Sequence, residues 1–263
     1  MAGRETVEGL IGFAVADDFS SLAVVQVASE TDFAGRSDTF VKLVQDVTSS
    51  VLEQNDITNT LLTTEQLHAL AKKSSSTDNS TTVKDLLDNA IVSIRENLSV
   101  PSAAKYVATQ PDSIWMPYAH NKVPGTETGT AVAAVLVGPA SSSPSSVDAE
   151  TLQAVGKRLA MHVVAAKPQY LDKTSIPADV LDKEKAVLQA QIELDNSKSG
   201  GKAKPPEIVE KMIQGRLRKF YEQVCLTEQL HMVETGNPKV SKVLQESGVA
   251  VQKFVYLAIG SSA

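Results

Sequence analysis

The segment from Pro177 to Leu226 constrains the fold of this chain more than any other. Apolar residues repeat at seven-residue spacing in its first part and at helical spacing in its second. Between them lies a polar stretch with two glycines and two prolines, residues 196–206, which no continuous helix can cross. Amphipathic helices joined by such a loop pack in opposite directions, so the segment predicts an antiparallel helical hairpin at about residues 178–226.

The apolar stripes that face each other in this hairpin follow from the spacing, which is typical of a coiled coil. They comprise Val180, Leu181, Val187, Leu188, Ile192 and Leu194 in the first helix and Ile208, Val209, Met212, Ile213, Leu217, Phe220 and Val224 in the second. Lys211, Arg216, Arg218 and Lys219 fall on the other side of the second helix. We interpret them as a solvated face, which could also contact an acidic partner.

The rest of the chain mixes strand and helix patterns. Residues 22–28 and 131–137 are apolar runs of strand length, and residues 252–259 predict a final strand. Helical periodicity follows Asp38 and Asp148, and a further apolar stripe runs from Val83 to Leu98. These patterns predict an α+β fold.

A serine-rich run at residues 141–146 has neither apolar periodicity nor helix propensity. We place a boundary there, between an N-terminal core subdomain at residues 1–140 and a C-terminal core subdomain at residues 141–263. Each is expected to be α+β, with the hairpin inserted in the second.

Composition excludes several classes of function. The formal charge of −6 argues against a protein that grips nucleic acid along a broad basic face, although it leaves room for a local basic patch. The single cysteine, Cys225, cannot form a disulfide within the chain, which is typical of a reducing compartment. The longest apolar run, Ala131 to Val137, is far shorter than the roughly 20 residues of a membrane span.

The usual catalytic signatures are missing. A phosphate-binding loop ending at Gly201 and Lys202 would need a glycine where Asn196 stands. The four histidines are far apart, and neither a zinc-binding spacing nor a G-x-S-x-G or H-E-x-x-H motif occurs. A dispersed hydrolytic triad stays open, but these absences favour a binding protein over an enzyme.

Three stretches, in chain order, carry a family resemblance. Residues 25–36 read VQVASETDFAGR, residues 161–168 read MHVVAAKP, and residues 215–229 contain GRLRKFYE and LTEQ. They resemble the T-D-F-V-A-[KR]-N, M-H-[IV]-A-A-x-x-P and G-R-[LM]-x-K-F…L-x-[EG]-Q motifs of the elongation factor Ts family. The resemblance extends from about Val7 to Ile259, and it matches the family's core without its small N-terminal helical module.

The resemblance implies a guanine-nucleotide exchange factor that binds elongation factor Tu and releases GDP, without catalytic residues, metal or cofactor. It implies no direct nucleic-acid partner, no membrane and no small-molecule substrate. On this basis Asp32 and Phe33 would form a wedge beside the partner's nucleotide and magnesium site. Thr31 and Arg36 flank them, and His120 in Tyr118-Ala119-His120 matches the family's Y-x-H. From the residues alone, Asp32 is equally well interpreted as a helix N-cap or turn residue, and His120 as a structural residue.

Further partner contacts implied by the motifs are Met161, His162, Arg216, Lys219 and Phe220. We interpret His162 as a packing or partner-facing residue rather than a metal ligand.

Departures from the family pattern keep a second function open. Ala34 and Gly35 replace Val-Ala, Ser37 replaces Asn, and we expect Gly35 to make the loop more mobile. An interaction or scaffold protein that binds without nucleotide exchange is therefore the alternative. The divergent motifs and serine-rich insertions predict an organellar member of the family in the mitochondrial matrix, with plastid and bacterial cytoplasm as alternatives.

Overall fold

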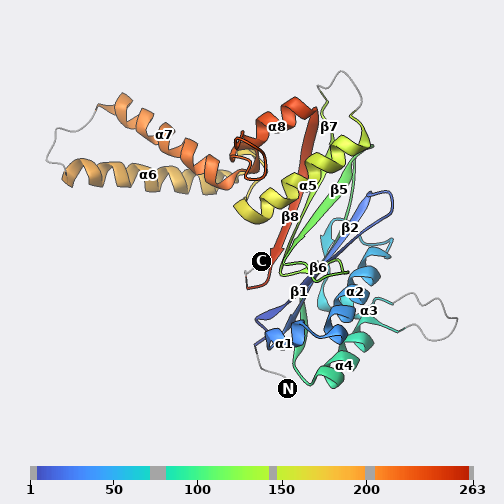
Figure 1. The fold of residues 1–263 in the computed structure, drawn as a ribbon. Coiled ribbons are helices and arrows are strands. Elements are labelled where there is room, and N and C mark those ends of the chain that lie inside the picture. Colours follow the sequence, from blue (N-terminus) through green and yellow to red (C-terminus); the bar gives the residue numbers. More distant parts are fainter. Residues whose placement is uncertain (1–4, 72–80, 142–146, 199–204, 261–263) are drawn as a thin grey trace. The chain divides into compact units, whose positions relative to one another are not determined.

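The computed structural model describes residues 5–71, 81–141, 147–198 and 205–260 (Figure 1). The chain forms two compact units: unit 1 comprises residues 1–164 and 247–263, and unit 2 comprises residues 165–246. These units differ from the predicted division at 140/141, which stays a prediction. The α+β class is confirmed, since helices accompany antiparallel sheets.

Unit 1 contains a five-stranded antiparallel sheet with the order β3-β4-β2-β1-β6. Its strands are β1 (Glu8–Val15), β2 (Ser21–Ser29), β3 (Thr60–Leu61), β4 (Leu98–Val107) and β6 (Thr128–Gly129). A second antiparallel sheet has the order β5-β7-β8. It is formed by β5 (Ile114–His120), β7 (Ala131–Pro139) and β8 (Val249–Ala258). The strands predicted at residues 22–28, 131–137 and 252–259 are thus confirmed.

Unit 1 also contains helices, which lie between the strands along the chain. They are α1 (Asp32–Gly35), α2 (Asp38–Leu52), α3 (Thr64–Ala69), α4 (Val83–Ile94) and α5 (Ala149–Ala166), the last of which ends in unit 2. Asp148 accepts a hydrogen bond from the Thr151 backbone N–H at 2.6 Å, as expected at the start of α5. Gly156 lets α5 approach the second sheet, because a Cβ there would lie 2.6 Å from Met116 Cγ.

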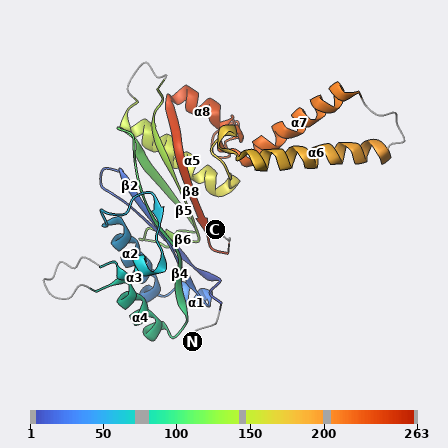
Figure 2. The same cartoon turned by 180° about the vertical axis from the view of Figure 1, so that it is seen from behind.

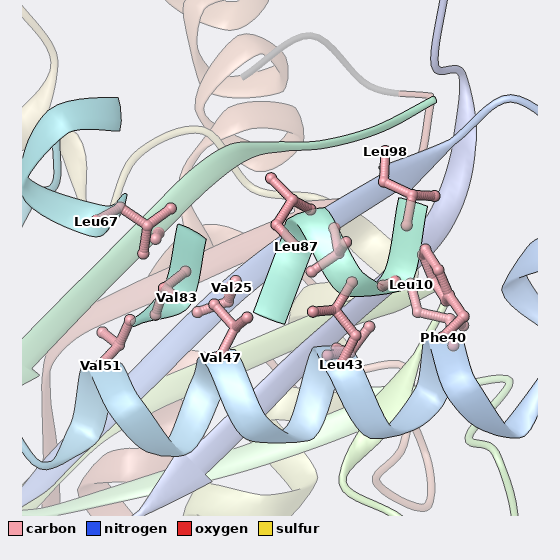
Figure 3. Packing of buried hydrophobic residues seen from close by; sticks show 14 of the residues in the cluster. Leu10, Val25, Phe40, Leu43, Val47, Val51, Leu67, Val83, Leu87 and Leu98 are labelled. Carbon is pink, nitrogen blue, oxygen red and sulfur yellow. The ribbon is translucent and has the colours of Figure 1, made fainter. Parts of the chain in front are cut away.

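Successive residues of β2 point to opposite faces of the five-stranded sheet, and both faces are covered. Val25 packs with α2, α3 and α4 in one apolar core (Figure 3). Leu22 and Val24 pack instead with Trp115 and Val132 of the second sheet. This double burial explains why the strand is a continuous apolar run rather than an alternating one.

The predicted helical stripe from Val83 to Leu98 is wrong at its end. α4 stops at Ile94, Arg95 adopts a left-handed conformation, and Leu98 begins β4. Pro101 is compatible with this strand because β3 pairs only with Lys105 and Ala104, which leaves one edge of β4 open at the proline.

Unit 2 consists mainly of two long helices that lie side by side (Figures 1 and 2). Its elements are η1 (Lys173–Ser175), α6 (Ala178–Lys198), α7 (Pro206–Val224), η2 (Leu226–Glu228) and α8 (Val240–Ser247), whose last residue belongs to unit 1. Arg216 in α7 pairs with Asp195 late in α6, whereas Val224 packs in a cluster with Val180 early in α6. The two helices are therefore antiparallel, and we call them the α6–α7 pair.

The apolar stripe of α6 that faces α7 is narrower than predicted. Leu188 and Ile192 are buried, but Val187 and Leu194 are 51% and 53% exposed. The pair Leu188 and Ile192 and the pair Val187 and Leu194 each repeat at helical spacing. Neighbouring residues point about 100° apart around the helix axis, so only one of the two pairs can face α7. Ile208, assigned to the facing stripe of α7, is also exposed.

Ion pairs join the short segments η1 and η2 and the residue before α8. Glu228 lies 3.0 Å from Lys173 Nζ and 3.3 Å from Lys239 Nζ. Burial opposes ionisation of Glu228, but hydrogen bonds and charge from the two lysines outweigh it and lower the pKa of this carboxyl. Cys225 is buried here, and burial, with nearby carboxylates, raises the pKa of its thiol to about 11.

Candidate partner-binding site

The Thr31–Arg36 turn, residues 31–36, joins β2 to α2 and contains the one-turn helix α1. Four helical residues cannot hold this conformation alone, because helix nucleation is unfavourable. Thr31 is the N-cap, and its Oγ1 accepts a hydrogen bond from the Ala34 N–H at 3.4 Å. Asp32 is therefore a first-turn residue and not the N-cap.

A distant carboxylate fixes the start of this turn. Thr31 Oγ1 donates to Glu96 Oε1 at 2.6 Å, and the Thr31 backbone N–H donates to Glu96 Oε2 at 3.0 Å. Next to this contact, Glu30 Oε1 accepts the Asn97 backbone N–H at 2.8 Å. Three hydrogen bonds thus join residues 30–31 to residues 96–97, just before β4 begins.

The end of the turn is fixed by Ser37, which caps α2. Its Oγ donates to the Ala34 carbonyl at 2.8 Å and accepts the Phe40 N–H at 3.2 Å. Phe40 is fully buried in the core of unit 1. The same serine therefore joins the turn to a rigid helix.

The inner side of α1 is buried. Ala34 is almost completely covered, and Gly35 is buried within the helix. The space where a Cβ of Gly35 would lie is 3.9 Å from the Gly9 backbone of β1. The structure thus places Gly35 in a packed helix and not in the open loop that we expected.

The outer side of α1 carries an exposed aromatic ring. Phe33 is 78% exposed, although its backbone lies in this anchored turn. Next to it, Arg36 Nη2 pairs with Asp32 Oδ2 at 3.0 Å, and both groups are well exposed. An apolar ring beside an ion pair on a fixed base can insert into a partner's surface with little ordering of its own backbone.

Thr31, Asp32, Phe33 and Arg36 therefore lie together on one turn, whereas His120, which was predicted with them, lies on another element of unit 1. His120 is exposed at the end of β5, in the three-stranded sheet. Its backbone pairs with Ala131 of β7, and its carbonyl accepts the Thr130 N–H at 3.0 Å.

Two of the predicted partner contacts have side chains that lie against other residues of the chain. His162 is fully buried in α5, which favours the packing interpretation, and its role as a partner contact stays a prediction; Met161 beside it is half-buried. Arg216 was placed on the solvated face, but its guanidinium donates to Asp195 at 3.1 Å and to Gln191 at 3.3 Å on α6.

The remaining residues of α7 differ in exposure. Phe220 is half-buried in the cluster formed with Ile176 and Val224. Lys219 is exposed, as expected for a solvated face.

Sequence reasoning missed Glu96, which holds Thr31. No local pattern marks it, because it follows α4 and lies 65 residues from its partner. A turn stabilised across the fold leaves its anchor in an unremarkable stretch of sequence.

The described part of the chain shows no convergence of three or more histidine, cysteine or acidic side chains suited to a metal ion. Over the same residues, none of the helices combines the length and apolar character required to cross a bilayer. The anchored turn with its exposed aromatic ring is the kind of surface found on proteins that act by contact with a macromolecular partner.

Comparison with known proteins identifies this class more closely. Residues 30–261 match the family model described as elongation factor TS. The chain is 36% identical to elongation factor Ts of Rhodospirillum rubrum over 247 residues, which cover 94% of this chain and 71% of that protein. It is 34% identical to elongation factor Ts of Gluconobacter oxydans over 260 residues, which cover 98% and 76% of the two chains.

The chain therefore belongs to the elongation factor Ts family. Members of this family are nucleotide exchange factors of translation and catalyse no covalent chemistry, and the family implies elongation factor Tu as the partner. The two relatives named above are bacterial.

Proposed function

We propose that this chain binds elongation factor Tu in its GDP-bound form and promotes GDP release, so that GTP can load. Asp32 and Phe33 form the wedge, which enters beside the partner's nucleotide and magnesium site. The observation that carries this proposal is the exposure of Phe33 on a turn held by Thr31, Glu96 and Ser37.

The energy of such a wedge is sufficient. Transfer of one phenylalanine side chain from water into an apolar contact is worth about 1.5–3 kcal/mol. A tenfold faster release requires only about 1.4 kcal/mol. Because the backbone of the turn is already ordered, little of this free energy is lost to ordering on binding.

Exchange then follows from linkage between the two ligands of the partner. An exchange factor that binds nucleotide-free elongation factor Tu more tightly than the GDP-bound form weakens the binding of GDP. GDP weakens the binding of the exchange factor by the same factor. No proton transfer is required. Arg36 holds the Asp32 carboxylate at the tip and limits where it can point.

Other contacts extend this interface. His120 is an exposed contact for the partner's nucleotide-binding domain, and Met161 and Lys219 are further contacts. Arg216 and Phe220 act through the shape of the α6–α7 pair, because their side chains lie against other residues of unit 2. For the compartment we propose the mitochondrial matrix, with plastid and bacterial cytoplasm as alternatives; imaging of the tagged protein decides among them.

The test is stopped-flow release of a fluorescent GDP from elongation factor Tu. We expect the native chain to accelerate release at least tenfold, and Phe33→Ala and Asp32→Ala to remove most of the effect. Val92→Ala is the matched control, because Val92 on α4 is 77% exposed and lies outside the turn. A stable complex with unchanged GDP release would contradict the proposal and support the scaffold alternative.

A further inference from the structure

One face of α7 carries a hollow that the exchange function does not use. Its volume is about 620 Å³, and all of its lining residues belong to unit 2. They are Lys173, Glu210, Lys211, Gln214, Gly215, Arg218 and Tyr221.

The charge of this hollow is mainly positive, in a chain whose net charge is −6. Within the described residues, neither Lys211 nor Arg218 has an ion-pair partner. Lys173 forms an ion pair with Glu228, and its Nζ lies 5.4 Å from the centre of the Tyr221 ring. The one acidic residue, Glu210, already accepts a hydrogen bond from Gln214 at 3.0 Å.

Gly215 lies in the interior of α7, where a glycine costs about 0.5–1 kcal/mol relative to alanine. Apart from its chain neighbours and the backbone of its own helix, no heavy atom of the described residues lies within 4 Å of the position that a Cβ would take there. Gly156 in α5 differs, because its missing Cβ makes room for Met116. Packing within the described chain therefore gives no reason for Gly215, whereas close approach of a ligand to the helix does.

The spacing of the charges suits a chain of anions. Lys211 and Arg218 are seven residues apart, so they lie on one face of α7 and about 10 Å apart along its axis. A guanidinium binds phosphate in a two-pronged geometry, and a lysine adds a point charge. Two neighbouring groups of one phosphodiester strand can therefore be held.

The volume and the aromatic wall distinguish a nucleotide from a carboxylate. Sites of about 300–1,000 Å³ accommodate ligands of drug size, whereas the carboxylate of an acidic peptide needs only contact with the cations. Tyr221 supplies a half-buried ring in the wall of the hollow, fixed by its packing against the Ile176 and Val224 cluster and with Lys173 Nζ over it. Stacking of bases on such rings is how single-stranded nucleic acids are bound without regard to sequence.

From these observations we propose that the hollow binds a nucleotide of single-stranded RNA, with phosphates on Lys211 and Arg218 and a base against Tyr221. The function proposed above gives none of the residues that line this hollow a role in nucleotide exchange. It differs from our expectation of no direct nucleic-acid partner, which rested on the net charge of the whole chain. Because few phosphates are contacted, binding is weak and sensitive to salt.

The test is fluorescence anisotropy of a labelled oligoribonucleotide of about 12 nucleotides, a length within known single-strand site sizes, titrated with the full chain at several salt concentrations. Two phosphate contacts predict a slope of about −1.4 for log K against log salt, and Arg218→Gln reduces its magnitude by about 0.7. Gly215→Gln fills the hollow and weakens binding severalfold, while it improves helix propensity, so misfolding does not explain a loss.

Lys185→Gln on α6 is the matched control, because it removes the same charge from a residue outside the hollow and leaves binding unchanged. Equal losses in Lys185→Gln and Arg218→Gln would overturn the proposal in favour of diffuse attraction. Competition by a polyglutamate peptide as strong as by unlabelled RNA would assign the hollow to an acidic protein. Binding of free GMP as tight as that of the oligonucleotide would exclude RNA as the specific ligand.

Discussion

The Thr31–Arg36 turn and the α6–α7 pair both hold apolar side chains in water, but different forces fix them. The turn is too short to be stable alone, and it depends on Glu96, far along the chain. The α6–α7 pair depends on its own buried stripe, which includes Ile192 and Leu217. A turn anchored across the fold and a helix pair anchored within a single segment should therefore respond differently to mutation.

The largest expected effect tests the buried stripe of the α6–α7 pair. Ile192→Ala removes a fully buried side chain and should lower the free energy of unfolding by about 2–5 kcal/mol. Val187→Ala, at an exposed position of the same helix, should change it by less than about 0.5 kcal/mol. Urea denaturation followed by far-UV circular dichroism measures both, and similar losses would show that the stripe is wrongly assigned.

The next effect tests the anchor of the turn. Glu96→Gln leaves one carbonyl oxygen for two donors of Thr31, and loss of a hydrogen bond to a charged group costs about 1.5–3 kcal/mol. We expect a fall in stability of that order or less, together with severalfold slower GDP release. Glu53→Gln, at the exposed end of α2, is the control and should change neither. Normal release by Glu96→Gln would mean that the turn needs no anchor.

A smaller effect tests the carboxylate that holds unit 2. The pKa of Glu228 is lowered in the fold, so its ionised form contributes stability above the ordinary value of 4.5. The difference in stability between the native chain and Glu228→Gln should be constant near neutral pH. It should disappear as the pH falls below 4.5 and through the folded pKa. Denaturation at a series of pH values measures it, and a difference that grows on acidification would contradict the assignment.

The smallest effect tests the packing beneath Phe33. Gly35→Ala adds a methyl group at an ordinary contact distance within a helix, and such changes stabilise by about 0.4–1 kcal/mol. GDP release should be unaffected. Gly9→Ala is the opposite case, since its φ is +140° and the new Cβ would lie 2.1 Å from the Val27 carbonyl oxygen. Thermal denaturation compares the two, and a destabilised Gly35→Ala would argue for a more crowded turn.

Periodicity predicted the elements that one apolar stripe defines. α2 and α5 were found because each buries one face, and β2 because both of its faces are buried. It missed β1, where Gly9 and Gly12 interrupt the apolar run; a Cβ at Gly12 would lie 2.4 Å from Thr48 Oγ1. Gly12 has no side chain, and this absence both weakens the apolar pattern of the strand and lets α2 approach the sheet.

The candidate site was predictable only in part. The family resemblance placed Thr31, Asp32, Phe33 and Arg36 together, and they do lie on one turn. Neither the resemblance nor the periodicity indicated Glu96, because a hydrogen bond between distant residues leaves no spacing to detect. Periodicity placed both Leu188 and Val187 on the facing stripe, but only Leu188 is buried, because the buried side depends on how α7 packs against α6.

The bond between Thr31 and Glu96 also sets an order of events during synthesis. A growing chain that ends before residue 96 contains Phe33 but lacks the carboxylate that orders its turn. Long-range contacts of this kind form late, after loop closure across the intervening residues. We therefore expect the turn that carries Phe33 to be fully ordered only after residue 96 has been synthesised and has reached Thr31.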